Sequence, residues 1–228
     1  MRPLVPDIGA GGTVRFMSAL GEDLSDRSTP EPVRLLIEIP STSHGDLIVR
    51  YPYQNDSDYA FAYHEAAKRL ASTFRGAPID DTILLPFLML YRHAFELRLK
   101  HLIRYLAETR RRYQEPGNKD ISRKSVEKRL RHEHGHQLRP LLEELLVHLK
   151  ALDLDSDFPP DVVSTISLLH EADSTGMAFR YAQQLPDTQE RTNFLALAAL
   201  LDEQLNMLTV TEDYVDGLFA DAPDDYMH

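Results

Sequence analysis

The sequence predicts a mainly α-helical protein, in which a bundle of four to five helices carries an N-terminal β-hairpin. Apolar residues recur at spacings of three and four from about residue 56 onward, which is the helical period. Two short β-branched runs precede this region and favour strands. The chain has 228 residues, 43% hydrophobic and 27% charged, which excludes collagen-like, low-complexity and wholly disordered classes.

The N-terminal region is predicted to form an arm followed by the hairpin. Residues 1–31 contain Gly, Pro and Ser with little periodicity, and they lack the apolar core of a signal peptide. Residues 33–39 and 47–53 are apolar and flank the turn-rich stretch PSTSHGD. Because two strands alone are marginally stable, we expect the hairpin to lie on another element.

The first two helices follow. Residues 56–57 provide caps for a helix that ends just before Gly76. A long second helix starts at residues 80–82 and reaches about Arg112, with an expected kink at Pro86. Its apolar stripe consists of Leu84, Leu88, Tyr91, Phe95, Leu99, Leu102 and Leu106.

The remaining chain is predicted to hold three more helices. Residues 113–125 form a polar loop, and helices are expected over 136–151, 161–172 and 188–218. An irregular stretch separates the last two. The sequence contains no internal repeat and no interdomain linker. We therefore divide the chain into residues 1–55 (arm and hairpin), 56–220 (bundle) and 221–228 (acidic tail).

Charge is distributed unevenly. The net charge of −11 argues against general DNA coating. Residues 92–139, however, contain 14 Lys or Arg and 6 Asp or Glu, a net charge of +8, and 5 of the 10 histidines. A solvated helix face with a basic loop is the simpler interpretation, and a local phosphate site is the alternative.

Several chemistries are excluded or disfavoured. The chain has no cysteine, so it can form neither disulfides nor iron–sulfur clusters. No apolar run reaches the ~18 residues of a membrane span, so we expect a soluble cytoplasmic protein. The histidines of RHEHGH, residues 132, 134 and 136, could chelate zinc or nickel, but no obvious carboxylate accompanies them. No metal and no cofactor are therefore expected.

Arg92, Glu96 and Lys100 lie four residues apart in the second helix. Exposed pairs of this spacing contribute only ~0.2–0.5 kcal/mol each. The helix is apolar around most of its circumference, so these residues are expected to be largely buried, and a buried Arg needs a charged partner. We interpret Glu96 as the partner of Arg92 in a structural ion pair, which we favour over catalysis. His93 points about 100° around the helix from Arg92.

An ordered set of motifs resembles the HEPN superfamily (higher eukaryotes and prokaryotes nucleotide-binding) over residues 57–215. The matching residues are Leu90, Tyr91, Arg92, His93, Glu96, Leu97, Leu99 and Lys100, then His136, Leu138, Leu141 and Leu142, then Asp173, Ser174, Phe179, Arg180 and Tyr181. The resemblance implies a helical bundle that is commonly a homodimer. It also implies RNA as the partner, since active members are metal-independent ribonucleases, often of toxin–antitoxin or anti-phage systems.

The resemblance also implies a site. In the family an Arg holds phosphate and a His transfers a proton, which the chemistry of both side chains suits. Arg92, His93 and His136 are then the candidate catalytic residues. Candidate phosphate or RNA contacts are Lys100, Arg131 and Arg180. The usual spacing from Arg to His, four to six intervening residues, is not met from Arg92 within its own helix.

Two other functions stay open. The chain could be a non-catalytic accessory subunit that binds a protein partner through the hairpin edge or through its acidic surface. It could also be a bundle that binds a nucleotide or another small molecule.

Overall fold

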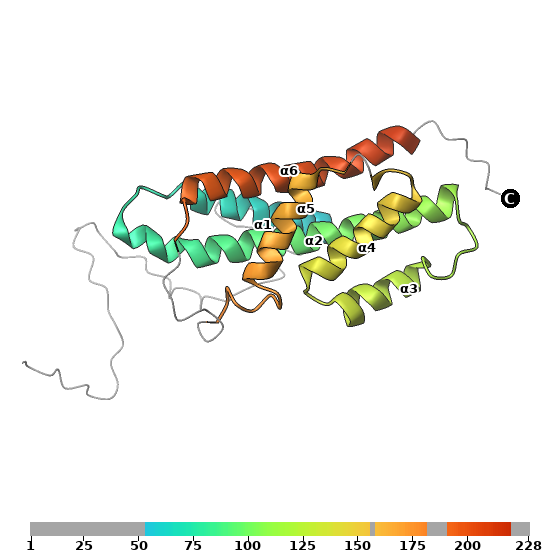
Figure 1. Cartoon of the computed structure of the whole chain (residues 1–228), viewed down its shortest axis with the longest axis horizontal. Helices are drawn as coiled ribbons and strands as arrows, with labels where there is room; N and C mark the ends of the chain where they lie inside the picture. The colour runs from blue at the N-terminus through green and yellow to red at the C-terminus, as the bar shows by residue number, and fades with distance from the viewer. Residues whose placement is uncertain (1–52, 156–157, 182–190, 220–228) are drawn as a thin grey trace, which may run out of the picture. The chain divides into compact units, whose positions relative to one another are not determined.

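The computed structural model describes residues 53–155, 158–181 and 191–219, and it confirms a helical bundle (Figure 1). The described residues form six α-helices and no strand. The helices are α1 Asp56–Ala71, α2 Asp81–Tyr113, α3 Arg123–Lys128, α4 Leu138–Ala151, α5 Pro160–Ala172 and α6 Phe194–Phe219. The predicted arm and hairpin lie outside the described residues, apart from residues 53–55, as does the tail 221–228.

Helix α1 is capped by Asn55 and not by Asp56 or Ser57 as predicted, so it begins slightly earlier than expected, and it also ends earlier. The side chain of Asn55 accepts hydrogen bonds from the amides of Ser57 (2.7 Å) and Asp58 (3.3 Å), and Asp58 accepts one from the Asn55 amide (2.8 Å). This reciprocal capping box satisfies amides that lack a partner within the helix. The helix stops at Ala71, so Gly76, with φ of +75°, belongs to the following loop and not to the helix end.

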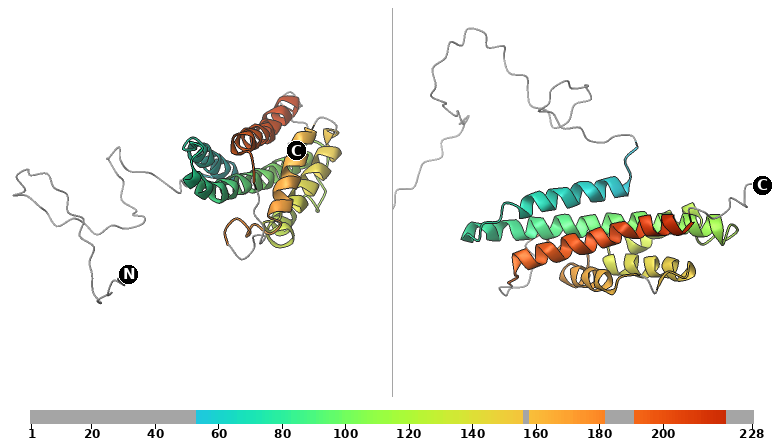
Figure 2. Two further views of the ribbon diagram at one scale, coloured as in Figure 1. Left: turned by 60° about the vertical axis from the view of Figure 1, so that its left-hand side comes forward. Right: turned by 90° about the horizontal axis from the view of Figure 1, so that it is seen from above.

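Helix α2 is the centre of the bundle and contacts α1, α3, α4 and α6. The predicted stripe residues Tyr91, Phe95, Leu99, Leu102 and Leu106 are buried, whereas Leu84 and Leu88 are only partly buried. Phe87, which is not in the predicted stripe, is fully buried as well. Burying each such side chain contributes about 1.5–3 kcal/mol. Figure 2 shows α1 and α6 running along α2, with α4 against α2 on another side, while α5 packs on α4 and α6. This packing holds the middle of α2 between elements that are distant in sequence.

The polar loop predicted over 113–125 is shorter than expected. Helix α3 starts at Arg123, after Ser122, whose hydroxyl accepts a hydrogen bond from the amide of Ser125 (3.3 Å). A π-helical turn, η2 (Arg129–His134), continues it. Only Val126 and Leu130 bury apolar side chains here, and two apolar positions give too weak a period to predict a helix.

The last three helices match the prediction except at one end. Helices α4 and α5 begin and end within two residues of the predicted bounds. Helix α6 begins at Phe194, whereas a start near Thr188 was predicted. Residues 191–193 are not helical, because Asn193 caps the helix by accepting from the amide of Ala196 (3.2 Å).

In the described part of the chain, α6 is the one helix long and apolar enough to cross a membrane. It packs against α1, α2 and α5, and Leu201, Leu205 and Leu208 are buried in that contact. It also contains five carboxylates. Core helices of soluble proteins meet the same criterion of length and composition.

Candidate functional site

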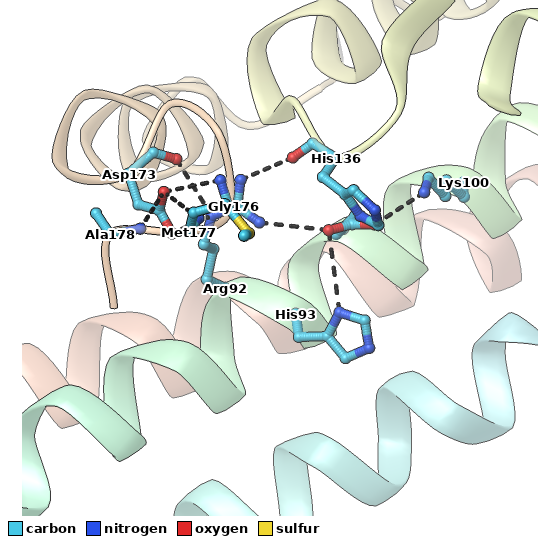
Figure 3. Close-up of polar contacts among 9 residues, drawn as sticks. Arg92, His93, Lys100, His136, Asp173, Gly176, Met177 and Ala178 are labelled. Carbon is cyan, nitrogen blue, oxygen red and sulfur yellow. Dashed lines mark hydrogen bonds and ion pairs between the residues drawn. The ribbon is translucent and has the colours of Figure 1, made fainter. Parts of the chain in front are cut away.

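Three segments meet on one side of α2 and bring polar groups together (Figure 3). Tyr91, Phe95 and Leu99 face the core, so the neighbouring stripe of α2, about 100° around the helix, faces the start of α4 and the loop after α5. The polar groups that meet there are Arg92, His93, Glu96 and Lys100 of α2, His136 before α4, and Asp173 after α5.

Glu96 lies at the centre of these groups and is only 1% exposed. Its Oε1 accepts hydrogen bonds from Lys100 Nζ and from His136 Nδ1, both at 2.8 Å. Its Oε2 accepts one from Arg92 (3.3 Å) and lies 3.9 Å from Nδ1 of His93. Burial alone would raise the pKa of Glu96. The contacts with His93, Lys100 and His136 outweigh burial and hold this pKa well below its ordinary value, so the carboxylate is ionised.

Arg92 is enclosed, with 3% of its surface exposed. Its Nε donates to the carbonyl oxygen of Asp173 (3.2 Å) and lies 3.1 Å from the carboxylate of the same residue. A terminal nitrogen donates to the carbonyl oxygen of His136 (2.7 Å), and the other to Glu96. Gly176 lies against the guanidinium, since a Cβ there would be 3.0 Å from a terminal nitrogen. Arg92 therefore joins three segments, and its guanidinium is almost wholly enclosed.

Asp173 shapes the loop that closes over Arg92. Its Oδ1 accepts hydrogen bonds from the amides of Gly176 (2.7 Å), Met177 (2.9 Å) and Ala178 (3.1 Å), as Figure 3 shows. Asp173 is 2% exposed, and its second oxygen faces Arg92. In the sequence, Asp173 stands out only as part of the motif shared with the HEPN superfamily. The Asp-x-x-Gly spacing, which is typical of a side chain that organises a turn, could have indicated its role.

His136 differs from Arg92 because 63% of its side chain is exposed. Glu96 is ionised and can only accept, so Nδ1 of His136 carries the shared hydrogen. In the neutral ring Nε2 then has a free lone pair, and no hydrogen bond joins Nε2 to any residue that the structure describes. A buried carboxylate thus orients an exposed imidazole, which is an arrangement suited to proton transfer.

The other candidate residues of α2 are less accessible. His93 packs edge-on against the ring of Tyr63 from α1, with the ring centres 4.4 Å apart. The ammonium of Lys100 is held by Glu96, and only 14% of its side chain is exposed. Both residues line the site, but neither projects freely from it.

The charges of Arg180 and Arg131 act on different groups. Arg180 is exposed, and its positive charge acts on Arg92, whose pKa is lowered chiefly by burial. Arg131 is exposed on η2. Its charge acts on Glu127, whose pKa is lowered mainly by a hydrogen bond from Arg104 and further by Arg131. Arg131 makes no hydrogen bond or ion pair with Glu96, Arg92 or His136 in the described part of the chain.

Sequence reasoning missed His170 of α5, which lies near the site. Burial lowers its pKa, and the charges of Arg139 and Arg92 lower it further. Its imidazole is consequently more readily neutral than an ordinary histidine. No spacing in the sequence connects His170 to α2, because the proximity arises from helix packing alone.

A second polar cluster, around Glu144, joins α4 to η2 and to the end of α2. Arg129 donates two hydrogen bonds to Glu144 (2.7 and 3.0 Å), and His134 contacts its other oxygen. The buried ring of His148 lies 3.5 Å from Glu144 and accepts a hydrogen bond from Arg110 (3.0 Å). Burial would raise the pKa of Glu144, but His148, Arg129 and His134 together lower it to about 2.

The alternate histidines of RHEHGH do not converge. His134 contacts Glu144, His136 contacts Glu96, and His132 is exposed on η2. Among the described residues, no group of three or more His, Asp or Glu side chains is arranged to hold a metal ion.

Comparison with family models, with curated proteins and with solved structures finds no match to this chain. The function of the chain is therefore inferred from the geometry of the Glu96 site and from the HEPN resemblance of its sequence.

Proposed function

We propose that this chain acts on RNA as a metal-independent endoribonuclease, with His136 as its proton-transfer group. The observation that carries the proposal is the exposed imidazole of His136, held through Nδ1 by the buried, ionised Glu96. A positioned general base typically accelerates a reaction by about 10²–10⁴-fold.

The chemistry requires no metal. The proton of a ribose 2′-hydroxyl passes to Nε2 of His136, and the 2′-oxygen attacks the adjacent phosphorus. The bond from phosphorus to the 5′-oxygen breaks, and that oxygen takes a proton from solvent. The products are a 2′,3′-cyclic phosphate and a 5′-hydroxyl. His136 is returned to its neutral form by releasing its proton.

Binding of the RNA backbone is assigned to the basic face of α3 and η2, defined as Arg123, Lys124, Lys128 and Arg131. All four are exposed, and none forms an ion pair with a described residue. The chain passes from Arg131 to His136 in five residues, so the basic face leads to the proposed catalytic group. Phosphate contacts of this kind supply affinity without sequence preference.

Arg92 takes a positioning role in this proposal. Its donors go to Asp173, Glu96 and the His136 carbonyl, so a phosphate could reach it only by breaking those bonds. Arg180, exposed nearby, is the better placed cation for phosphate. The homodimer implied by the HEPN resemblance is part of the same proposal.

The test is cleavage of a long single-stranded RNA in EDTA by the full chain, His136→Ala and His132→Ala. His132 is the matched control, because it is an exposed histidine of the same segment. We expect His136→Ala to lose cleavage by about 10²-fold or more and His132→Ala to keep it. Equal rates in all three proteins, or no cleavage by the full chain, would reject the ribonuclease.

A non-catalytic RNA-binding protein is the second candidate, and the enclosure of Arg92 favours it. In that case the Glu96 cluster serves only to join α2, α4 and the loop after α5. RNA would then bind with strong salt dependence and remain intact in the presence of the full chain.

A further inference from the structure

An apolar groove lies between the C-terminal half of α6 and residues at either end of the connection from α4 to α5, and no candidate catalytic residue lines it. Its volume is about 360 Å³. Leu149, Leu154 and Phe158 form its nearly buried floor. Met207 and Val210 line the α6 side and are 41% and 50% exposed. The groove is therefore open to a partner along α6.

The exposed apolar side chains of α6 form a continuous stripe. Met207, Val210, Tyr214 and Leu218 are spaced by three and four residues, so they share one helix face. The face of α6 that packs on the bundle is a different one, where Leu205 is buried. Contiguous exposed apolar surface with a polar rim is typical of protein interaction sites.

Three carboxylates next in sequence to lining residues make the rim of the groove acidic. Asp153 and Asp155 flank the floor residue Leu154, and on α6 Asp213 is the immediate neighbour of Tyr214. All three carboxylates are exposed and form no ion pair with a described residue, although the charge of Asp213 also acts on Arg98 of α2. Residues 151–163 and 194–219 contain no Lys, Arg or His, and the nearest cation in sequence is Lys150.

We propose that this groove binds an amphipathic helix of a protein partner, whose apolar face carries Lys or Arg along its edges. Apolar side chains spaced by one helical turn fit a groove that itself follows a helix. The basic edges meet the carboxylates of Asp153, Asp155 and Asp213, which accelerates association and fixes orientation. This binding site is independent of the proposed ribonuclease.

Charge decides between this occupant and two others. A second copy placed symmetrically would bring acidic rim against acidic rim, which repels. An anionic lipid surface would be repelled by the same carboxylates. Of these three occupants, a basic apolar partner is the one that suits both the groove and its rim.

The experiment measures binding of a fluorescein-labelled peptide of Leu and Lys, arranged as an amphipathic helix, to the full chain by fluorescence anisotropy. The probe is compared with a scrambled peptide of the same composition, at low and at moderate salt. Met207→Gln and Val210→Gln test the apolar wall. Leu168→Gln is their control, since Leu168 is 58% exposed and does not line the groove.

Each wall substitution should weaken binding by about tenfold, and the control should not change it. Asp153→Asn with Asp155→Asn should weaken binding and reduce its salt dependence. Glu143→Gln, an exposed carboxylate outside the groove, should do neither. Circular dichroism melting of every variant verifies that the fold is kept.

Three outcomes would overturn the proposal. The first is equal affinity for the scrambled peptide, or no binding of either peptide. The second is self-association of the full chain that Val210→Gln abolishes, which would assign the groove to a second copy. The third is binding to phosphatidylserine vesicles that Val210→Gln abolishes, which would assign it to a membrane.

Discussion

Gly176→Ala is expected to destabilise the protein because the substitution strains the backbone and presses on Arg92. Gly176 has φ of +82°, and an L-residue in this region costs about 1–2 kcal/mol. The new Cβ would lie 3.0 Å from a terminal nitrogen of Arg92 and 3.2 Å from its Cζ and other terminal nitrogen. Overpacking of this kind costs about 1–3 kcal/mol. The two effects sum to about 2–5 kcal/mol of unfolding free energy.

Gly76→Ala provides the matched control. Gly76 has φ of +75°, but no atom lies within 4 Å of the position a Cβ would take. It should therefore lose only the backbone contribution of about 1–2 kcal/mol. The difference between the two variants measures the contact with the guanidinium.

The assay is urea unfolding followed by circular dichroism, with the dependence of free energy on urea compared between variants. Gly176→Ala should shift the midpoint to lower urea than Gly76→Ala does, at an unchanged slope. If both variants lose the same free energy of unfolding, Gly176 does not pack against Arg92, and Arg92 is not enclosed by this loop.

Three further predictions concern buried charge and RNA binding. Because the pKa of Glu144 is lowered in the folded state, its contribution to stability is complete above about pH 4.5 and is lost as the pH falls toward 2; urea unfolding against pH should show a smaller loss for Glu144→Gln than for the full chain, because Glu96 keeps its own pH dependence in both proteins. Glu96→Gln removes the negative charge that balances the buried cations around it, and it should lower the free energy of unfolding by about 3–5 kcal/mol in the same assay. Replacing Lys124 and Lys128 with Ala should reduce the slope of log affinity for single-stranded RNA against log salt by about 1.4, whereas Lys150→Ala should leave the slope unchanged.

Each of these has a contradicting result. If stability depends on pH in the same way in Glu144→Gln as in the full chain, the neighbours of Glu144 do not lower its pKa. A loss below about 1 kcal/mol in Glu96→Gln would show that the site is solvated. Equal slopes for the Lys124, Lys128 and Lys150 variants would remove the basic face from RNA binding.

The helices could be predicted where apolar side chains repeat over several turns. Helix α2 has such a repeat from Leu84 to Leu106, and its bounds were predicted within two residues. Helix α3 has only Val126 and Leu130, so its apolar face was not recognisable in the sequence. The start of α6 is set by one capping side chain, Asn193, and the apolar period of the sequence does not indicate which residue caps the helix.

The candidate site shows the same limit. The four-residue spacing of Arg92 and Glu96 indicates a pair in any helix, so this part follows from local sequence. Whether Arg92 faces solvent depends on Asp173 and Gly176, which are about eighty residues further along the chain. That enclosure results from tertiary contacts. Because it keeps Arg92 from substrate, the catalytic role is proposed for His136.

The most direct test of the central claim is the rate of RNA cleavage in EDTA by His136→Ala, measured with and without added imidazole. If the imidazole of His136 transfers the proton, the variant should be nearly inactive, and free imidazole should restore part of the rate in proportion to its concentration. Cleavage by the variant at the rate of the full chain, with no response to imidazole, would contradict the role assigned to His136.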